Sequence, residues 1–234
     1  MQFKIDTKIM QQFPDVTIGV LVGKNVNNNG ESDITTTLLL EIINNLKMTY
    51  KVEDITSIPK INEWRNAYKL FGCKPSKYHS SIESLLRRVL KNKPMPTISP
   101  LVDCYNYISL KYFVPAGGGD LDKIHGDIAL TVATGNEQFM LLGTNDLQNI
   151  AASEVIYTDQ NKVLCRAWNY RESEQSKITD DTQNVYLVLE GLSHTSYDEM
   201  QQALHELQNL VSKYCGGTFT QFILDQNNVG RNIS

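Results

Sequence analysis

A short segment in the middle of the chain places a carboxylate and an amide at a spacing suited to a shared site. In Leu101–Ser109 (LVDCYNYIS), Asp103 and Asn106 are three residues apart among apolar neighbours. In a helix, both side chains would lie on one face. Buried polar side chains need hydrogen-bond partners. Two interpretations stay open: the pair caps or braces nearby backbone, or it contributes to a functional site.

A run of three glycines follows this segment. Gly117, Gly118 and Gly119 expose bare backbone N–H groups, which can approach an anion closely. The run has neither the G-x-x-x-x-G-K-[ST] nor the G-x-G-x-x-G pattern, and no strong helix pattern follows it. A phosphate loop is therefore disfavoured. We expect a tight turn with positive φ, whose backbone would serve equally well to line a substrate pocket.

A second dense segment, Arg166–Arg171 (RAWNYR), has two arginines and two aromatic residues directly after a predicted strand. Aromatic rings can stack on a base or sugar, and arginines can bind phosphates. The alternative is an aromatic sheet edge with solvated arginines.

The histidines and cysteines show no metal-binding pattern. The four histidines are dispersed without H-E-x-x-H spacing, and the four cysteines contain no C-x-x-C pair. We therefore predict no metal site and no cofactor, and we expect buried, reduced thiols. A Cys or Ser nucleophile with a distant His base stays open, although no nucleophile-elbow motif supports it.

Charge is unevenly distributed along the chain. The net charge is −4, but Lys60–Lys93 has nine basic residues against only Glu63 and Glu83, which gives this stretch +7 and the remainder −11. A basic region on an acidic body can direct a polyanion to one face. Solvated, lysine-rich helices would give the same pattern.

The first ninety residues are predicted to be mostly helical. After an expected strand at 17–22 and a loop at 25–31, apolar residues recur at helical spacing. Ser32 or Asp33 is a possible cap for the first of these helices, and Gly72 would end the second. Ser80 with Glu83 forms a predicted capping box for a third helix, which Pro94 stops. The apolar stripes are Leu38, Leu39, Ile42, Ile43 and Leu46; Ile61, Trp64, Tyr68 and Phe71; and Ile82, Leu85, Leu86 and Val89.

The remaining residues are predicted to be mainly β-structure. Ser99 is placed to cap a short helix with Pro100 in its first turn. Strand-like runs follow at 128–133, 138–142, 154–157, 163–166 and 185–189. A last amphipathic helix starts at Ser196 and Glu199 and ends at Gly216 and Gly217. This order predicts an α+β fold. We expect one domain over 1–234, with a mostly helical part (1–98) and a β-rich core plus last helix (99–234).

Length and composition exclude some classes of protein. A chain of 234 residues with 41% hydrophobic and 21% charged residues can bury a core. Its apolar runs are far shorter than the ~20 residues of a membrane-spanning helix, and its start has no signal-peptide pattern. We therefore expect a soluble, cytoplasmic protein without a membrane partner.

Five ordered motifs carry a resemblance to a known family. They are FGCKPSKYHSSIESLLRR at Phe71–Arg88, LVDCYN at Leu101–Asn106, PAGGGDLDKI at Pro115–Ile124, CRAWN at Cys165–Asn169 and DTQNV at Asp181–Val185. Together they resemble the free-standing B3/B4 domain proteins, which are relatives of the editing domain in the bacterial phenylalanyl-tRNA synthetase β subunit. The resemblance implies a β-rich B3/B4-type core flanked by helices.

The resemblance also implies a reaction. The synthetase domain hydrolyses the ester of tRNA mischarged with tyrosine, so the implied activity is an aminoacyl-tRNA deacylase and not a ligase. Asn106 matches the asparagine of the synthetase's V-D-x-x-N segment and is expected to orient substrate or water. The N–H groups of Gly117 and Gly118 are expected at the oxyanion. Trp168 and Asn169 would shape the pocket or receive the terminal adenosine, and Asp103, Asp120 and Thr182 are further expected pocket residues.

Two positions depart from the synthetase. Gly117 stands where the synthetase has a histidine, two residues after the proline that matches Pro115. The glutamate that recognises the tyrosine hydroxyl falls at Val188, and Glu190 lies two residues further on, on the same face of a strand. Glu190 is therefore a candidate catalytic-site residue, and the amino acid recognised stays open.

The expected partner is aminoacylated tRNA, mischarged in the editing hypothesis, and no DNA partner is expected. Candidate phosphate-binding residues are Lys74, Lys77, Arg87, Arg88, Arg166 and Arg171. Two alternatives to a trans-acting hydrolase remain: a tRNA- or RNA-binding module without catalysis, and a small-molecule-binding protein on the same fold.

Overall fold

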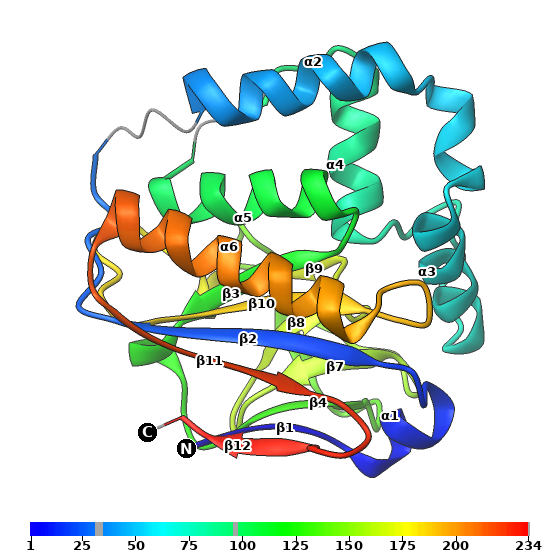
Figure 1. Cartoon of the computed structure of the whole chain (residues 1–234). Coiled ribbons are helices and arrows are strands. Elements are labelled where there is room, and N and C mark those ends of the chain that lie inside the picture. The colour runs from blue at the N-terminus through cyan, green and yellow to red at the C-terminus, as the bar shows by residue number, and fades with distance from the viewer. Residues whose placement is uncertain (31–34, 96–97, 234) are drawn as a thin grey trace.

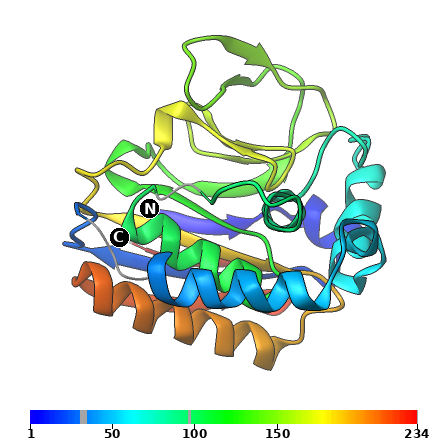
Figure 2. The same cartoon turned by 90° about the horizontal axis from the view of Figure 1, so that it is seen from above.

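The computed structural model describes residues 1–30, 35–95 and 98–233, and two large sheets form its centre (Figure 1). The six-stranded sheet has the order β12 (Gly230–Asn232), β1 (Gln2–Ile5), β4 (Ile128–Val132), β7 (Val155–Thr158), β8 (Val163–Arg166) and β9 (Arg171–Glu172). The four-stranded sheet has the order β11 (Thr218–Leu224), β2 (Thr17–Lys24), β10 (Val185–Gly191) and β3 (Ala116–Asp120). A third sheet pairs β5 (Gln138–Met140) with β6 (Leu147–Asn149) and stands out from the body in Figure 2. This sheet-rich core with flanking helices confirms the α+β prediction.

Helices cover the outer face of the four-stranded sheet. α5 (Pro100–Tyr112) and α6 (Tyr197–Cys215) lie on that sheet, and α2 (Leu40–Thr49), α3 (Pro59–Leu70) and α4 (Ser81–Leu90) form an outer group (Figure 1). The shorter elements are α1 (Thr7–Gln12), η1 (Thr35–Leu39), η2 (Val52–Ser57), η3 (Leu121–Lys123) and η4 (Glu174–Ser176). Of the helices in the described ranges, none combines the length and hydropathy that spanning a bilayer requires.

Strand β10 is buried on both faces and separates two cores. Val185, Leu187 and Leu189 pack with α5 and α6. Tyr186 and Val188 point the other way and pack with residues of the six-stranded sheet. Because side chains alternate along a strand, Glu190 shares the face of Tyr186 and Val188 and lies between the two sheets. This confirms that Glu190 and Val188 share a face.

The prediction of a turn at the glycine run is wrong. Ala116–Asp120 is a strand paired antiparallel with β10, and Gly117 lies opposite Val188. Positive φ angles occur at other glycines of the described chain. The reason for glycine here is close approach, since a Cβ on Gly118 would lie 2.4 Å from the backbone oxygen of Tyr186. Pairing with β10 therefore imposes a strand on residues of low β-propensity.

The predicted helices form, but two caps differ from expectation. Ser80 accepts a hydrogen bond from the N–H of Glu83, whereas the Glu83 carboxylate binds arginines instead of closing a capping box. α5 begins at Pro100, but the side chain of Ser99 makes no capping bond in the described structure; Asn28, from the loop after β2, accepts the N–H of Leu101 instead. The expected caps Ser32 and Asp33 lie outside the described residues.

The helical N-terminal part and the β-rich remainder share both sheets. β1 pairs with β4 and β12, and β2 lies between β10 and β11. The first 24 residues thus supply a strand to each large sheet before the helices begin. This arrangement places the N-terminal helices α3 and α4 beside strands that come much later in the chain.

Candidate functional site

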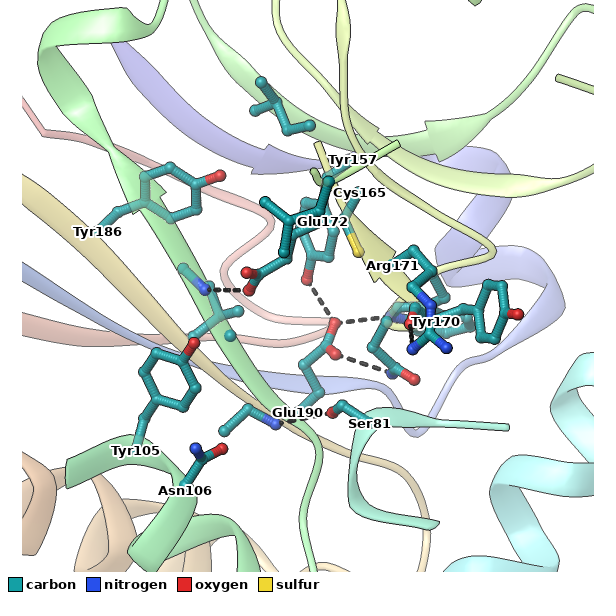
Figure 3. A pocket seen from close by; sticks show the side chains of 18 residues that line it. Ser81, Tyr105, Asn106, Tyr157, Cys165, Tyr170, Arg171, Glu172, Tyr186 and Glu190 are labelled. Carbon is teal, nitrogen blue, oxygen red and sulfur yellow. Dashed lines mark hydrogen bonds between the residues drawn. The ribbon is translucent and has the colours of Figure 1, made fainter. Parts of the chain in front are cut away.

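A cavity of about 210 Å³ opens where the two large sheets meet the start of α4 and the middle of α5 (Figure 3). Most of its wall is aromatic or apolar, and two carboxylates, two amides and one guanidinium face it. Its lining residues are Ser81, Tyr105, Asn106, Ala116, Gly117, Gly118, Leu142, Tyr157, Leu164, Cys165, Trp168, Asn169, Tyr170, Arg171, Glu172, Tyr186, Val188 and Glu190. A concave, mainly apolar site with a few convergent polar groups is the usual form of a ligand pocket.

Glu190 is a buried carboxylate held by three neutral donors. One oxygen, Oε1, accepts the Tyr157 hydroxyl at 2.6 Å and the Trp168 indole N–H at 2.8 Å, and Oε2 accepts the Asn169 amide at 2.8 Å. Burial raises the pKa of Glu190 to about 7, although the three hydrogen bonds oppose that rise. Near neutral pH this carboxyl can therefore take up or release a proton.

The loop between β8 and β9 supplies two of these donors. Ala167 and Trp168 have positive φ angles of 45° and 64°. These conformations are uncommon for residues other than glycine, and tertiary contacts must hold them. The Trp168 ring packs edge-on against Trp64 of α3 and against Phe13. The distances between ring centroids are 5.0 Å and 4.8 Å. The N-terminal segments thus fix the indole that binds Glu190.

Glu172 is the second carboxylate of the cavity. It lies at the end of β9, and its Oε1 accepts the N–H of Gly118 at 3.0 Å. Burial raises the pKa of Glu172 to about 7, and the hydrogen bond from Gly118 only partly offsets this. The sequence analysis did not select Glu172, because a two-residue strand gives no periodic signal.

The predicted catalytic residues all line the cavity, but the glycines already have partners. Asn106 reaches it from α5, and its side-chain amide has no hydrogen bond to the described residues (Figure 3). The Gly118 N–H donates to Glu172. The N–H groups of Ala116 and Gly118 point away from β10, so that of Gly117 points toward it. In this conformation neither glycine offers a free N–H to an oxyanion.

The expected pocket residues separate into two groups. Trp168 and Asn169 line the cavity. Asp103, Asp120 and Thr182 are buried outside its lining. Asp120 accepts the Thr182 hydroxyl at 2.8 Å and lies 3.2 Å from the Lys123 ammonium, at the opposite end of β3 from the cavity. This pair connects β3 to the segment before β10 and is a structural contact.

Arg166 does not face solvent as a phosphate-binding residue would. Its guanidinium binds both carboxylate oxygens of Glu154, at 3.1 and 3.0 Å, and also Gln148. The two charged side chains are 14% and 4% exposed. Arg166 is therefore neutralised inside the fold, and the expectation that it contacts tRNA phosphates is not supported by its position.

A basic groove lies directly beside the cavity. This groove has a volume of about 450 Å³ and shares Ser81, Asn106, Ala116, Tyr170 and Arg171 with the cavity. Its cationic lining residues are Arg87, Arg88, Lys91, Lys93 and Arg171, and His79, whose pKa is lowered by burial, also lines it. Of the remaining expected phosphate-binding residues, Lys74 and Lys77 are exposed but do not line it.

Buried Glu83 anchors the wall of this groove. Its Oε1 lies 2.7 Å from Arg65 and 2.8 Å from Arg87, and Glu83 itself is completely buried. Arg88 instead donates to the backbone oxygen of Pro94 and is exposed. Arg87 is thus partly neutralised, whereas Arg88, Lys91 and Lys93 present their charge to the groove.

The four thiols are poorly suited to nucleophilic catalysis. Cys165 lines the cavity, and burial raises its pKa well above the usual range. Burial raises the pKa of Cys73 and Cys215 to about 12 and also raises that of Cys104. A protonated thiol is a weak nucleophile. Across the described residues, no three His, Cys, Asp or Glu side chains gather as metal ligands would.

Residues 63–216 match the family model described as the B3/4 domain. The chain belongs to the B3/4 domain family. The matched range contains every residue that lines the cavity. The resemblance seen in the five sequence motifs is thereby confirmed.

Relatives of this B3/4 domain protein include much longer proteins. It is 30% identical over 138 residues to the phenylalanine–tRNA ligase beta subunit of Francisella tularensis subsp. tularensis, covering 58% of this chain and 17% of that one. It is 32% identical over 103 residues to the corresponding subunit of Yersinia pestis, covering 44% of this chain and 13% of that one. The chain thus spans less than a fifth of the length of these curated relatives.

An N-terminal fragment of the phenylalanyl-tRNA synthetase beta-subunit from Pyrococcus horikoshii superposes with a TM-score of 0.48 and 13% identity, covering 94% of this chain and 53% of the fragment.

Proposed function

We propose that this B3/4 domain protein binds tRNA and hydrolyses the aminoacyl ester of mischarged tRNA in trans. The relatives are named as subunits of a tRNA ligase, which supports a tRNA partner. The activity proposed is that of an ester hydrolase and not of a ligase. Its place would be the cytoplasm, where tRNA is charged.

One observation carries this proposal: the cavity with its two carboxylates opens into the basic groove. The cavity of about 210 Å³ is smaller than the ~300–1,000 Å³ of pockets for drug-sized ligands, so it suits an aminoacyl group and not a whole nucleotide. The groove of about 450 Å³ suits the adjoining nucleotides, with phosphates near Arg88, Lys91 and Lys93. A charged 3′ end would then lie across the residues that line both spaces.

The chemistry required is modest, because an aminoacyl ester is already activated. In this proposal Asn106 orients the ester or the attacking water, and Glu190 accepts a proton from that water. The water oxygen forms a bond to the carbonyl carbon, the bond from that carbon to the ribose oxygen breaks, and the ribose oxygen takes up the proton. A carboxyl with a pKa of about 7 is well matched to this role at neutral pH.

The test is a deacylation screen of the purified protein against correctly charged and mischarged tRNAs. We expect hydrolysis of at least one mischarged tRNA, with a loss of about 10²-fold or more in Asn106→Ala and in Glu190→Gln. Asn44→Ala, on the exposed face of α2 and remote from the cavity, is the matched control and should retain full activity. Hydrolysis that persists undiminished in both cavity variants would come from elsewhere and would refute the assignment.

A second candidate is a tRNA-binding module without catalysis. It is favoured by the engaged N–H of Gly118, which leaves a developing oxyanion without the glycine donors expected from the sequence. Under this alternative the complete tRNA panel stays charged, while salt-dependent tRNA binding persists. The deacylation screen, together with a measurement of tRNA binding at several salt concentrations, therefore separates the two candidates.

A further inference from the structure

The Glu172 carboxylate has no cationic partner in the described part of the chain. Of its two oxygens, Oε1 accepts one neutral N–H, from Gly118, and no lysine, arginine or histidine among the described residues forms an ion pair with either oxygen. The same is true of Glu190, whose three donors are all neutral. Two carboxylates thus face one small cavity without a bound positive charge. Burial of unpaired carboxylates is costly, and a cation in the cavity would relieve that cost.

The one guanidinium of the cavity lining lies on the other side. The guanidinium carbon of Arg171 lies 4.5 Å from the centroid of the Tyr170 ring, and the Arg171 side chain donates a hydrogen bond to the Tyr170 backbone oxygen. Figure 3 shows Arg171 with Tyr170 on one side of the cavity and Glu172 with Tyr186 on the other. Arg171 therefore marks the side shared with the basic groove, and the Glu172 side stays negative.

Aromatic rings complete the surroundings of Glu172. The carboxylate acts electrostatically on Tyr105 and Tyr186, and through burial and this neighbour both hydroxyls have a raised pKa. Both phenols therefore remain neutral at physiological pH. A carboxylate beside neutral aromatic rings is a favourable environment for an ammonium group, because the ring faces also attract cations.

From this geometry we propose that Glu172 is the counter-ion for a primary ammonium group of the ligand. This inference rests on the proposed function: the ammonium is the α-amino group of the aminoacyl ester, placed between Glu172 and the tyrosines, with its ester toward Asn106 and the groove. An N-acylated amine has no positive charge. The site therefore selects free aminoacyl esters over esters whose amino group is blocked, such as those of peptidyl-tRNA.

The experiment compares ligands that differ only in the charged group. The probes are 3′-deoxy-3′-(L-aminoacyl)amino-adenosines with phenylalanyl, tyrosyl, leucyl and alanyl groups, each paired with its α-hydroxyacyl counterpart. Phenethylamine and butylamine, paired with 2-phenylethanol and butanol, test the ammonium without the nucleoside. Calorimetric titration is carried out on the wild type, on Glu172→Gln and on Glu53→Gln, an exposed control on η2.

We expect at least one amine to bind the wild type about tenfold or more tightly than its hydroxyl counterpart. Glu172→Gln should abolish most of that difference, and Glu53→Gln should retain it. Two results with the wild type alone would overturn the proposal. One is equal affinity for the amine and the hydroxyl compound in every pair of probes. The other is that no amine binds at millimolar concentration.

Failure of the proposed function has a different signature. If the simple amines bind through Glu172 but no charged tRNA is hydrolysed, the ammonium site stands and the editing function fails. If a mischarged tRNA is hydrolysed as fast when its α-amino group is replaced by a hydroxyl, the editing function stands and the ammonium site fails.

Discussion

The carboxylate of Glu172 occupies the space that a side chain at position 117 would need. A Cβ on Gly117 would lie 2.6 Å from Oε1 of Glu172, the oxygen that accepts the N–H of Gly118. The glycine therefore permits the carboxylate to reach the β3 backbone. A carboxylate from β9 thus fills, in this chain, a volume that a side chain on β3 would otherwise occupy.

This contact predicts that Gly117→Ala acts through Glu172. The new methyl group must displace the carboxylate and break its bond to Gly118. We expect the affinity for the amine probes to fall about tenfold, as in Glu172→Gln. In a double-mutant cycle, Gly117→Ala combined with Glu172→Gln should cost no more than either change alone. Additive losses would show that the two residues act independently.

Removal of the charge at Glu172 should stabilise the protein at alkaline pH. The folded-state pKa is raised from 4.5 to about 7, so this group's contribution to stability is full below about pH 4.5 and is lost as the pH rises through 7. Glu172→Gln retains an acceptor for Gly118 and has no charge to bury. At pH 8 we expect the variant to exceed the wild type by about 1–2 kcal/mol in free energy of unfolding. Urea denaturation at pH 5 and pH 8 measures this, and a less stable variant at pH 8 would contradict it.

Periodic sequence features predicted the fold well. Alternation along β10 indicated that Glu190 shares a face with Val188, and helical spacing gave the buried stripe of α3. These patterns are local, since each follows from one element packing on one core. The contacts that the sequence did not predict are non-local. The pairing of β3 with β10, which overrode the turn expected at Gly117–Gly119, joins segments about seventy residues apart.

The site was predicted only in part for the same reason. Asn106, Trp168, Asn169 and Glu190, which were selected from the sequence, line the cavity. Arg166 resembles a solvated arginine in sequence, and only the tertiary fold places Glu154 against it. Glu172 was missed because its role depends on the bare backbone of β3 and not on its own neighbours in sequence.

The hydroxyl of Tyr157 should tune the pH dependence of the proposed hydrolysis. This hydroxyl lowers the pKa of Glu190, so Tyr157→Phe should raise it above about 7 and reduce the ionised fraction at neutral pH. We expect the rate at pH 7 to fall about threefold to tenfold and to recover at higher pH. The measurement is a pH–rate profile. Tyr170→Phe changes another hydroxyl at the cavity, with no bond to Glu190, and its profile should keep the wild-type midpoint.

Arg166 should matter for stability and not for tRNA binding. Arg166→Ala leaves the Glu154 carboxylate buried without its cation, although that carboxylate still accepts the N–H of Ala167. Loss of one partner of a buried ion pair costs about 3 kcal/mol. Chemical denaturation should show this loss, while tRNA affinity measured below the unfolding transition should stay within about twofold of the wild type. A large loss of affinity in the folded variant would instead assign Arg166 to the tRNA interface.

The basic groove predicts which cations contact the phosphates. Arg88, Lys91 and Lys93 line the groove next to the cavity, whereas Lys74 and Lys77 are equally charged and exposed but lie outside it. Each phosphate contact contributes about 0.7–0.9 to the slope of log affinity against log salt concentration. The triple change of Arg88, Lys91 and Lys93 to alanine should therefore flatten this slope by about two and weaken tRNA binding.

Changing Lys74 and Lys77 together removes two charges without altering the groove. If that double variant flattens the slope as much per charge, binding follows the general basic character of Lys60–Lys93 and not the groove, and the path assigned to the 3′ end would have to be abandoned.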